Sequence, residues 1–285
     1  MKKTRFETEV HGKSLSEELA GARLLCDREG PALVEWFAKS GERLWDSLQP
    51  EIFQKLEFFS NRSTGLKLHA NASISTVEHL APVLLLYPQF HFEIHALSKE
   101  LPLFDGSAYP WYETIRKLAG IPQELQFYPS TLYERFDWGY GFMEVCPAET
   151  LEIEYSISHG TFHDDAYASI YEAADLVSLF PARTFIFESD VKLAKESGFL
   201  AAADETCGML LSELGDRAQI LLGGNFRMQS EPVKHKILDL IGDLSLPAPI
   251  LPKLRIRIHN GGHVAHRKLS ERLLNDAFRY SSQIN

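Results

Sequence analysis

The chain has 285 residues, with 29 Lys and Arg against 39 Asp and Glu, so its formal net charge at neutral pH is −10. Hydrophobic residues make up 45% and charged residues 24%, which excludes disordered and fibrous proteins and predicts about two globular domains. The negative charge argues against nucleic-acid binding, because an acidic surface repels the phosphate backbone.

The protein is expected in the cytoplasm, without an integral membrane segment. The longest apolar run, 80–87, is far shorter than the ~20 residues needed to cross a bilayer. The basic N-terminus is followed by Glu7 and Glu9 rather than by the apolar core of a signal peptide. Three widely spaced cysteines form no disulfide framework, which fits a reducing compartment.

The first half of the chain contains signals for both strands and helices. Ser75 and Thr76 are typical helix-capping residues, and Glu78 would lie in the first turn, where a carboxylate suits the helix dipole. In chain order we expect a strand over 4–10, a helix or strand over 17–26, a strand over 33–37, a helix over 75–88, a strand over 90–95 and a helix over 107–120.

Two prolines and a change of periodicity make 121–130 the best candidate for a linker. We therefore expect an N-terminal domain over 1–124 and a C-terminal domain over 125–285. Beyond the linker we expect a strand over 151–157, helices over 190–197 and 232–246, a strand over 254–258 and a helix over 263–281. Strands and helices occur in groups, which favours an α+β fold over a doubly wound parallel sheet.

Glu78 and His79 form the first candidate site. Neighbours on a helix point about 100° apart, so one side chain can bind a metal ion while the other acts on the metal's water. The structural alternative is a capping Glu beside a partly buried His.

His235 and Asp239 form the second candidate site. They lie four residues apart on a predicted helix and therefore share a face, and both side chains are zinc ligands. With His79 they would make the three-ligand set of a catalytic zinc site, which keeps one position open for water. The structural alternative is a surface His–Asp pair beside a solvated Lys236.

His263 is the third candidate, because it follows two glycines at the start of the last predicted helix. Asp243 lies one turn beyond Asp239 on the same helix face. A carboxylate near His263 would raise its pKa and keep it protonated, as an acid must be. The structural alternative is a solvent-facing His in the loop before the helix.

In this order and spacing, several stretches resemble the family of zinc-dependent UDP-3-O-acyl-N-acetylglucosamine deacetylases (LpxC-like) of lipid A biosynthesis. The matching stretches are Ser75-Thr76-Val77-Glu78-His79-Leu80, Phe104-Asp105-Gly106-Ser107-Ala108, Ala182-Arg183-Thr184-Phe185, His235-Lys236-Ile237-Leu238-Asp239, Ile241-Gly242-Asp243-Leu244 and Gly262-His263. The resemblance covers most of the chain from about residue 60 to the end. It implies two α+β domains of similar topology, helices packed between two sheet layers and an active site at the domain interface.

The resemblance also implies a reaction. His79, His235 and Asp239 would hold Zn²⁺, with Fe²⁺ as the alternative metal for such a ligand set. Glu78 would act as the general base, taking a proton from zinc-bound water that attacks the acetamide of the sugar.

Further roles follow for the remaining residues. The Thr184 hydroxyl and the zinc would stabilise the oxyanion, while His263, held by Asp243, would stabilise charge and protonate the leaving amine. Lys236 and Phe185 would contact the substrate, an acylated nucleotide sugar whose acyl chain would lie in an apolar passage. We expect the enzyme to be a monomer.

The chain departs from the family's pattern at several positions that shape the substrate site. A Gly-Leu-His-Ser-Gly-like element is absent from 9–15, and a Gly-Gly-Ser-x-Asp-Asn-like segment is replaced by Ala-Ala-Asp-Glu-Thr-Cys over 202–207. Cys146 stands where a nucleotide-binding lysine is expected, and Ser63-Thr64 replace a Cys-Thr-like pair. All catalytic positions are kept, so the alternatives are a divergent paralogue acting on another N-acetylated sugar and a non-catalytic ligand-binding relative.

Overall fold

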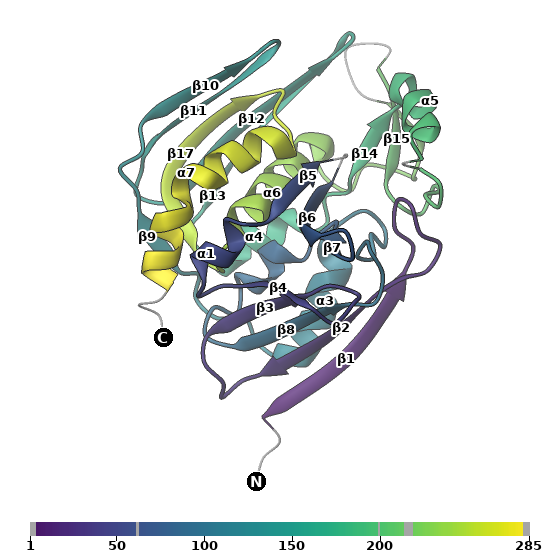
Figure 1. The fold of residues 1–285 in the computed structure, drawn as a ribbon. Helices are drawn as coiled ribbons and strands as arrows, with labels where there is room; N and C mark the ends of the chain where they lie inside the picture. The colour runs from purple at the N-terminus through teal and green to yellow at the C-terminus, as the bar shows by residue number, and fades with distance from the viewer. Residues whose placement is uncertain (1–3, 61–62, 199, 214–218, 282–285) are drawn as a thin grey trace.

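The computed structural model describes residues 4–60, 63–198, 200–213 and 219–281. Two mixed sheets form outer layers and helices lie between them (Figure 1). The protein is therefore an α+β protein with two sheet layers around central helices, as the resemblance implies. In the described ranges, no helix is long and apolar enough to cross a membrane.

The N-terminal sheet has five strands among the described residues, in the order β1-β2-β8-β3-β4. Their bounds are β1 (Arg5–Gly12), β2 (Ala20–Asp27), β3 (Leu33–Phe37), β4 (Arg43–Asp46) and β8 (His91–Ala96). All neighbours are antiparallel except β3 and β8, which run parallel. Alternate residues of β8 (Phe92, Ile94 and Ala96) are buried, which is the pattern of a strand with one covered face.

The C-terminal sheet repeats this arrangement. Its main path is β10-β11-β17-β12-β13, again antiparallel except for the parallel pair β12 and β17. The bounds are β10 (Glu134–Trp138), β11 (Gly141–Pro147), β12 (Leu151–His159), β13 (Phe162–Ile170) and β17 (Leu251–His259), with β9 (Phe127–Pro129) paired to the start of β17. In each sheet, four strands consecutive in the chain are joined by a later strand in the third position. The two sheets therefore share one topology.

Each half carries a small additional sheet. In the sequence it follows the fourth strand of the large sheet (β4 or β13) and precedes the last one (β8 or β17). In the N-terminal half it consists of β5 (Glu57–Ser60), β6 (Thr64–His69) and β7 (Ala72–Ser75), after the short helix α1 (Pro50–Phe53). In the C-terminal half it consists of β14 (Phe185–Phe187), β15 (Met209–Ser212) and β16 (Gln219–Leu222), with α5 (Glu188–Glu196) between β14 and β15. Figure 1 shows β14, β15 and α5 projecting at the upper right.

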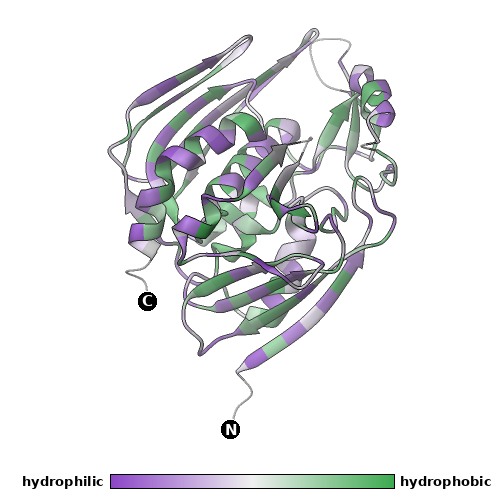
Figure 2. Cartoon of the chain, viewed as in Figure 1, coloured by the Kyte–Doolittle hydropathy of each residue, from purple (hydrophilic) through white to green (hydrophobic). Residues whose placement is uncertain are grey.

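Between the two large sheets lie α2 (Ala81–Leu84), α3 (Tyr109–Ala119), α4 (Ala173–Leu179), α6 (Glu231–Ser245) and α7 (His263–Ser281). Helix α6 contacts α2, α4 and α7 as well as β12, β13 and β17, and nearly all of its residues are buried. Figure 2 shows hydrophilic and hydrophobic residues alternating along strands of both sheets. Because α6 is enclosed, its polar residues His235, Asp239 and Asp243 are shielded from bulk water.

Most of the predicted elements are confirmed, with ends shifted by a few residues. The strands expected over 4–10, 33–37, 90–95, 151–157 and 254–258 correspond to β1, β3, β8, β12 and β17. The ambiguous stretch 17–26 overlaps strand β2, which runs one residue further. The helices expected from 107, 190, 232 and 263 correspond to α3, α5, α6 and α7. The predicted linker is too long, because its residues 127–129 form β9 and pair with β17.

The helix predicted from Ser75-Thr76 to Pro88 is wrong. Strand β7 continues to Ser75, and Thr76 has a φ of +59°, which no α-helix accommodates. The Thr76 hydroxyl donates a hydrogen bond of 2.8 Å to Glu100 instead of capping a helix. Only Ala81–Leu84 is helical, with a proline near its start, where the missing N–H has no helical partner to lose.

Candidate active site

His79, His235 and Asp239 meet in the interior, as predicted. His79 lies on the turn before α2, and His235 and Asp239 lie one turn apart on α6. The Nε2 atoms of His79 and His235 lie 3.5 and 3.2 Å from Asp239 Oδ1. One potential ligand atom from each residue lies within 4.8 Å of the others, and all three side chains are buried.

The bonding of this trio fits a metal ion. Asp239 Oδ1 is buried and has no hydrogen-bond partner among the described residues. Burial lowers the pKa of His235 to about 3, so the ring is neutral; its Nδ1–H donates to the Ala182 carbonyl at 3.1 Å and leaves the Nε2 lone pair free. An unpaired buried carboxylate oxygen facing two imidazole nitrogens is costly without a cation, and this donor set is typical of zinc.

Glu78 lies beside the trio on the same turn. Its side chain is 2% exposed, and Oε2 has no hydrogen-bond partner among the described residues. Burial raises the pKa of Glu78 to about 7, against the opposing influence of His263 and His79. A buried carboxyl group that titrates near neutrality is suited to general-base work.

Gly242 on α6 allows the Glu78 turn to approach the helix. A Cβ atom at Gly242 would lie 2.1 Å from the Glu78 carbonyl oxygen and 3.1 Å from its Cα. The Glu78 backbone therefore packs directly on α6, one turn from Asp239. A side chain at position 242 would occupy the space that this turn needs.

Replacing Gly242 with Ala should displace Glu78, because a backbone clash cannot be relieved by rotating a side chain. We expect a lower melting temperature and a loss of turnover larger than the loss of stability alone explains. Thermal unfolding and steady-state kinetics would measure both. The matched control is Gly41→Ser, at a positive-φ glycine with open space around it, which should change stability and leave kcat intact.

His263 and Asp243 form a second buried polar group, as predicted. His263 Nδ1–H donates to Asp243 Oδ2 at 2.8 Å, and the Thr64 hydroxyl donates to Asp243 Oδ1 at 2.5 Å. Burial lowers the pKa of His263, but the carboxylates of Asp243, Glu78 and Asp239 raise it by more, to about 9. The ring is therefore protonated at neutral pH, and its Nε2 lies 3.8 Å from Glu78 Oε1.

Thr184 is held by two of the motifs singled out in the sequence. Its backbone N–H donates to the Gly106 carbonyl at 2.7 Å, and a Cβ at Gly106 would lie 2.9 Å from the Thr184 methyl group. The preceding Arg183 pairs with Glu231 at the start of α6, with 2.7 Å between Nε and Oε1. The motifs around Gly106 and Arg183 therefore fix Thr184 relative to α6.

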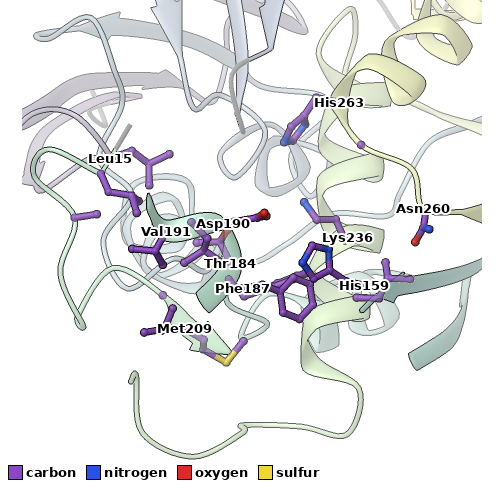
Figure 3. Close-up of a pocket in the computed structure, with 18 of the residues that line it drawn as sticks. Leu15, His159, Thr184, Phe187, Asp190, Val191, Met209, Lys236, Asn260 and His263 are labelled. Atoms are coloured by element: carbon purple, nitrogen blue, oxygen red, sulfur yellow. The ribbon is translucent and has the colours of Figure 1, made fainter. Parts of the chain in front are cut away.

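A pocket of about 820 Å³ opens beside these groups (Figure 3). Thr184, Phe185, Lys236 and His263 line it, together with side chains from the β14–β15 insert. In Figure 3, Lys236 and His263 point into the cavity opposite Leu15 and Val191. Lys236 Nζ lies 2.9 Å from Asp239 Oδ2 and 5.8 Å from the centre of the Phe185 ring.

The trio of His79, His235 and Asp239 borders a second, much smaller cavity. Thr184, His263 and Leu15 line both cavities, while Glu78, His79, His235 and Asp239 line the smaller one. The serines beside Leu15 are anchored by buried Glu100, whose Oε2 accepts hydrogen bonds from the Ser14 and Ser16 hydroxyls at 2.7 and 2.6 Å. These hydrogen bonds therefore hold the backbone around Leu15, a residue that lines both cavities.

Three residues of the site carried no role in the sequence reasoning. Leu15 lies in the segment that departs from the family's pattern, and Thr64 was noted only as a replacement. His266 was missed, although its spacing of three residues from His263 places both on one helix face. Leu15 and Thr64 lack any such local signal, because only long-range folding brings them to the site.

The chain is similar to known proteins over most of its length. Residues 37–275 match the family described as LpxC, UDP-3-O-acyl N-acetylglycosamine deacetylase. Among similar proteins are the UDP-3-O-acyl-N-acetylglucosamine deacetylases of Thermosynechococcus vestitus (32% identical, 70% of this chain and 69% of the relative), Thermodesulfovibrio yellowstonii (31%, 77% and 75%) and Aquifex aeolicus (28%, 75% and 74%). The chain thus belongs to the UDP-3-O-acyl N-acetylglycosamine deacetylase family.

Proposed function

We propose that this chain is a zinc-dependent deacetylase that hydrolyses the acetamide of UDP-3-O-acyl-N-acetylglucosamine in lipid A biosynthesis. One observation carries the proposal. A carboxyl group with a pKa near neutrality, Glu78, lies beside a buried trio whose Asp239 oxygen has no partner among the described residues. A pure ligand-binding relative has no need of a base placed beside an open metal position.

His79, His235 and Asp239 would hold the metal. We propose zinc because two imidazoles and one carboxylate, with a position left open, are its catalytic ligand set, and iron(II) is the alternative for the same donors. When bound there, the ion supplies Lewis acidity and makes water easier to deprotonate near neutral pH.

Glu78 acts as the general base in the proposed reaction. Its carboxylate takes a proton from water as the water oxygen forms a bond to the acetamide carbon. Burial favours this role, because a carboxyl group in an apolar setting holds the proton more strongly than one in water. The Thr184 hydroxyl, at the wall shared by both cavities, donates to the oxygen that gains charge.

His263 acts as the general acid in the proposed reaction. Its protonated ring, held by Asp243, stabilises negative charge and gives a proton to the amine nitrogen as the carbon–nitrogen bond breaks. The products are acetate and the free amino sugar. Lys236 lies beside Asp239 on the pocket wall, where its ammonium group can bind an anionic or carbonyl oxygen of the substrate.

The large pocket suits a substrate with both polar and apolar parts. Phe185, Phe187 and Met209 from the insert offer an apolar wall for an acyl chain. Lys236 and Lys268 offer positive charge for an anionic nucleotide. We propose that the acyl chain lies along the insert and that the sugar lies between Thr184 and His263.

The pH profile of kcat/KM should be bell-shaped. Without a metal, the pKa of Glu78 is about 7 and that of His263 is about 9. Glu78 must be deprotonated, so activity should rise as the pH passes through the first pKa; His263 must be protonated, so activity should fall as the pH passes through the second. A bound cation lowers both limits, because positive charge favours the carboxylate and the neutral ring. Glu78→Gln should remove the acidic limb and His263→Asn the alkaline limb. A flat profile across both limits would contradict these assignments.

A divergent paralogue is the second candidate, and the altered 202–207 segment favours it. This segment borders the pocket through Asp204, Glu205 and Cys207, and Asp204 pairs with Lys13 of the other departing segment at 2.5 Å. Acetate release from the acylated nucleotide sugar should be compared with release from UDP-N-acetylglucosamine, which lacks the acyl chain. Preference for the acylated compound supports the proposal, whereas activity only on other N-acetylated sugars would favour the paralogue.

Three further features belong to the proposal. We propose a domain boundary at 124–125, after helix α3 and before strand β9, which pairs with β17 of the C-terminal sheet. We also propose that the active unit is a monomer. A cytoplasmic location fits the three free cysteines, Cys26, Cys146 and Cys207.

A further inference from the structure

His266 is a fully buried polar side chain that the proposed mechanism does not use. It lies on α7, one turn after His263, and is 0% exposed. Its Nδ1 atom lies 2.8 Å from Asp243 Oδ2, the same oxygen that accepts the hydrogen bond from His263. One carboxylate oxygen therefore lies between two imidazole rings.

The second ring nitrogen of His266 is also occupied. The Tyr155 hydroxyl, on β12, lies 3.2 Å from His266 Nε2. Burial lowers the pKa of His266, so the ring is neutral and carries one proton. Because Nδ1 faces a carboxylate and must donate, Nε2 accepts from Tyr155, which fixes the tautomer.

Donors from two other elements, β6 and α7, consequently hold the Asp243 carboxylate. Asp243 stands on α6, the Thr64 hydroxyl of β6 donates to Oδ1 at 2.5 Å, and His263 and His266 of α7 donate to Oδ2. Tyr155 of β12 acts on the same group through His266. The end torsion of an aspartate is soft, so three donors confine the carboxylate far more than two do.

We propose that His266 is a positioning residue: it fixes the Asp243 carboxylate so that His263 presents Nε2 to the reaction centre. This inference rests on the deacetylase reaction proposed above. Filling the core is not a sufficient reason for His266, because an apolar side chain would fill the same space without needing two partners. The row of hydrogen bonds from Tyr155 through His266 and Asp243 to His263 is instead typical of the outer hydrogen bonds that orient functional histidines.

A matched pair of variants separates the effect of the His266 hydrogen-bond donor from the effect of the side chain's volume. His266→Asn keeps an N–H donor at the same distance from the backbone, whereas His266→Leu has a similar shape and no donor. We expect His266→Leu to lower kcat by about 10- to 100-fold with KM unchanged, as expected for loss of a hydrogen bond to a charged group. His266→Asn should recover most of this loss. Leu273→Ala, a buried α7 position, serves as the stability control and should leave kcat unchanged.

A second measurement is independent of turnover. The Nδ1–H proton of His263 can be followed by NMR in protein labelled with ¹⁵N-histidine. We expect this signal to shift or broaden in His266→Leu and to stay close to its original position in His266→Asn and Leu273→Ala. If the unmodified protein did not release acetate, the proposed function would fail while this signal still tested the role of His266.

Equal kcat values in the Leu and Asn variants, together with an unchanged His263 signal in both, would overturn the inference. Tyr155→Phe covers the case in which His266→Leu does not fold, because it removes only one oxygen. That change frees His266 to adopt the other tautomer, so we expect a smaller loss of kcat and a shifted His263 signal. An unchanged signal and an unchanged kcat in Tyr155→Phe would likewise overturn the inference.

Discussion

Replacing Glu78 with Gln is expected to lower kcat by about 10²- to 10⁴-fold while the bound metal stays in place. The amide keeps the shape of the side chain but does not accept a proton. Glu78 is not one of the trio that would hold the metal, so metal content measured by elemental analysis should match that of the unmodified protein. Steady-state acetate release measures the loss of turnover.

The control for Glu78→Gln is Glu35→Gln on the N-terminal sheet. Glu35 also pairs with a histidine, with 2.9 Å between its Oε2 and His91 Nε2, but it lies outside both cavities. This variant should keep full turnover. Near-native turnover in Glu78→Gln would show that another group is the base.

Replacing His79 with Ala is expected to remove both the metal and the activity. A three-ligand site that loses one ligand keeps only His235 and Asp239, and the open space admits water in place of the ring. We expect the metal content after dialysis to fall from one ion per chain to a small fraction. Turnover should fall at least as far as in Glu78→Gln, and added zinc should restore only part of it.

His91→Ala is the matched control for His79→Ala, because His91 belongs to a half-buried His–Glu group on the N-terminal sheet, away from the pocket. Its metal content and turnover should equal those of the unmodified protein. Metal loss in His91→Ala together with retention in His79→Ala would place the metal on the sheet and overturn the assignment of the site.

The sequence predicts the α6 part of the site because that part depends on local geometry. His235 and Asp239, and likewise Asp239 and Asp243, are four residues apart, and a helix brings such residues to one face whatever surrounds it. The Glu78–His79 pair was proposed from the angle between neighbours on an expected helix, and the family resemblance then supplied the roles of the two residues. The local structure of this pair was predicted wrongly: β7 runs to Ser75 and the Thr76 hydroxyl bonds to Glu100, which lies 24 residues further along the chain and gives no local signal.

The duplicated topology of the two sheets is not visible as a sequence repeat. Equivalent strands such as β3 and β12 share only an alternation of buried and less buried positions. Many different residue types can produce this alternation, so it leaves no recognisable repeat in the sequence. The similarity was therefore expected from the family resemblance alone. Parallel pairing of β3 with β8, and of β12 with β17, joins residues far apart in the chain, and no local pattern encodes it.

The supporting residues of the site were hardest to predict for the same reason. Thr64 and His266 bond to Asp243 from β6 and α7, and Tyr155 of β12 bonds to His266. Their role depends on the convergence of β6, β12 and α7 around α6. A buried carboxylate needs several donors, but its sequence does not say which residues supply them.

Titration of the metal-free chain with zinc, followed by acetate release from UDP-3-O-acyl-N-acetylglucosamine, tests the account most directly. The account predicts no turnover after chelation, recovery that saturates near one zinc per chain, and no recovery in Glu78→Gln at the same zinc content. Full turnover in the chelated protein, or recovery in Glu78→Gln equal to that of the unmodified chain, would contradict it.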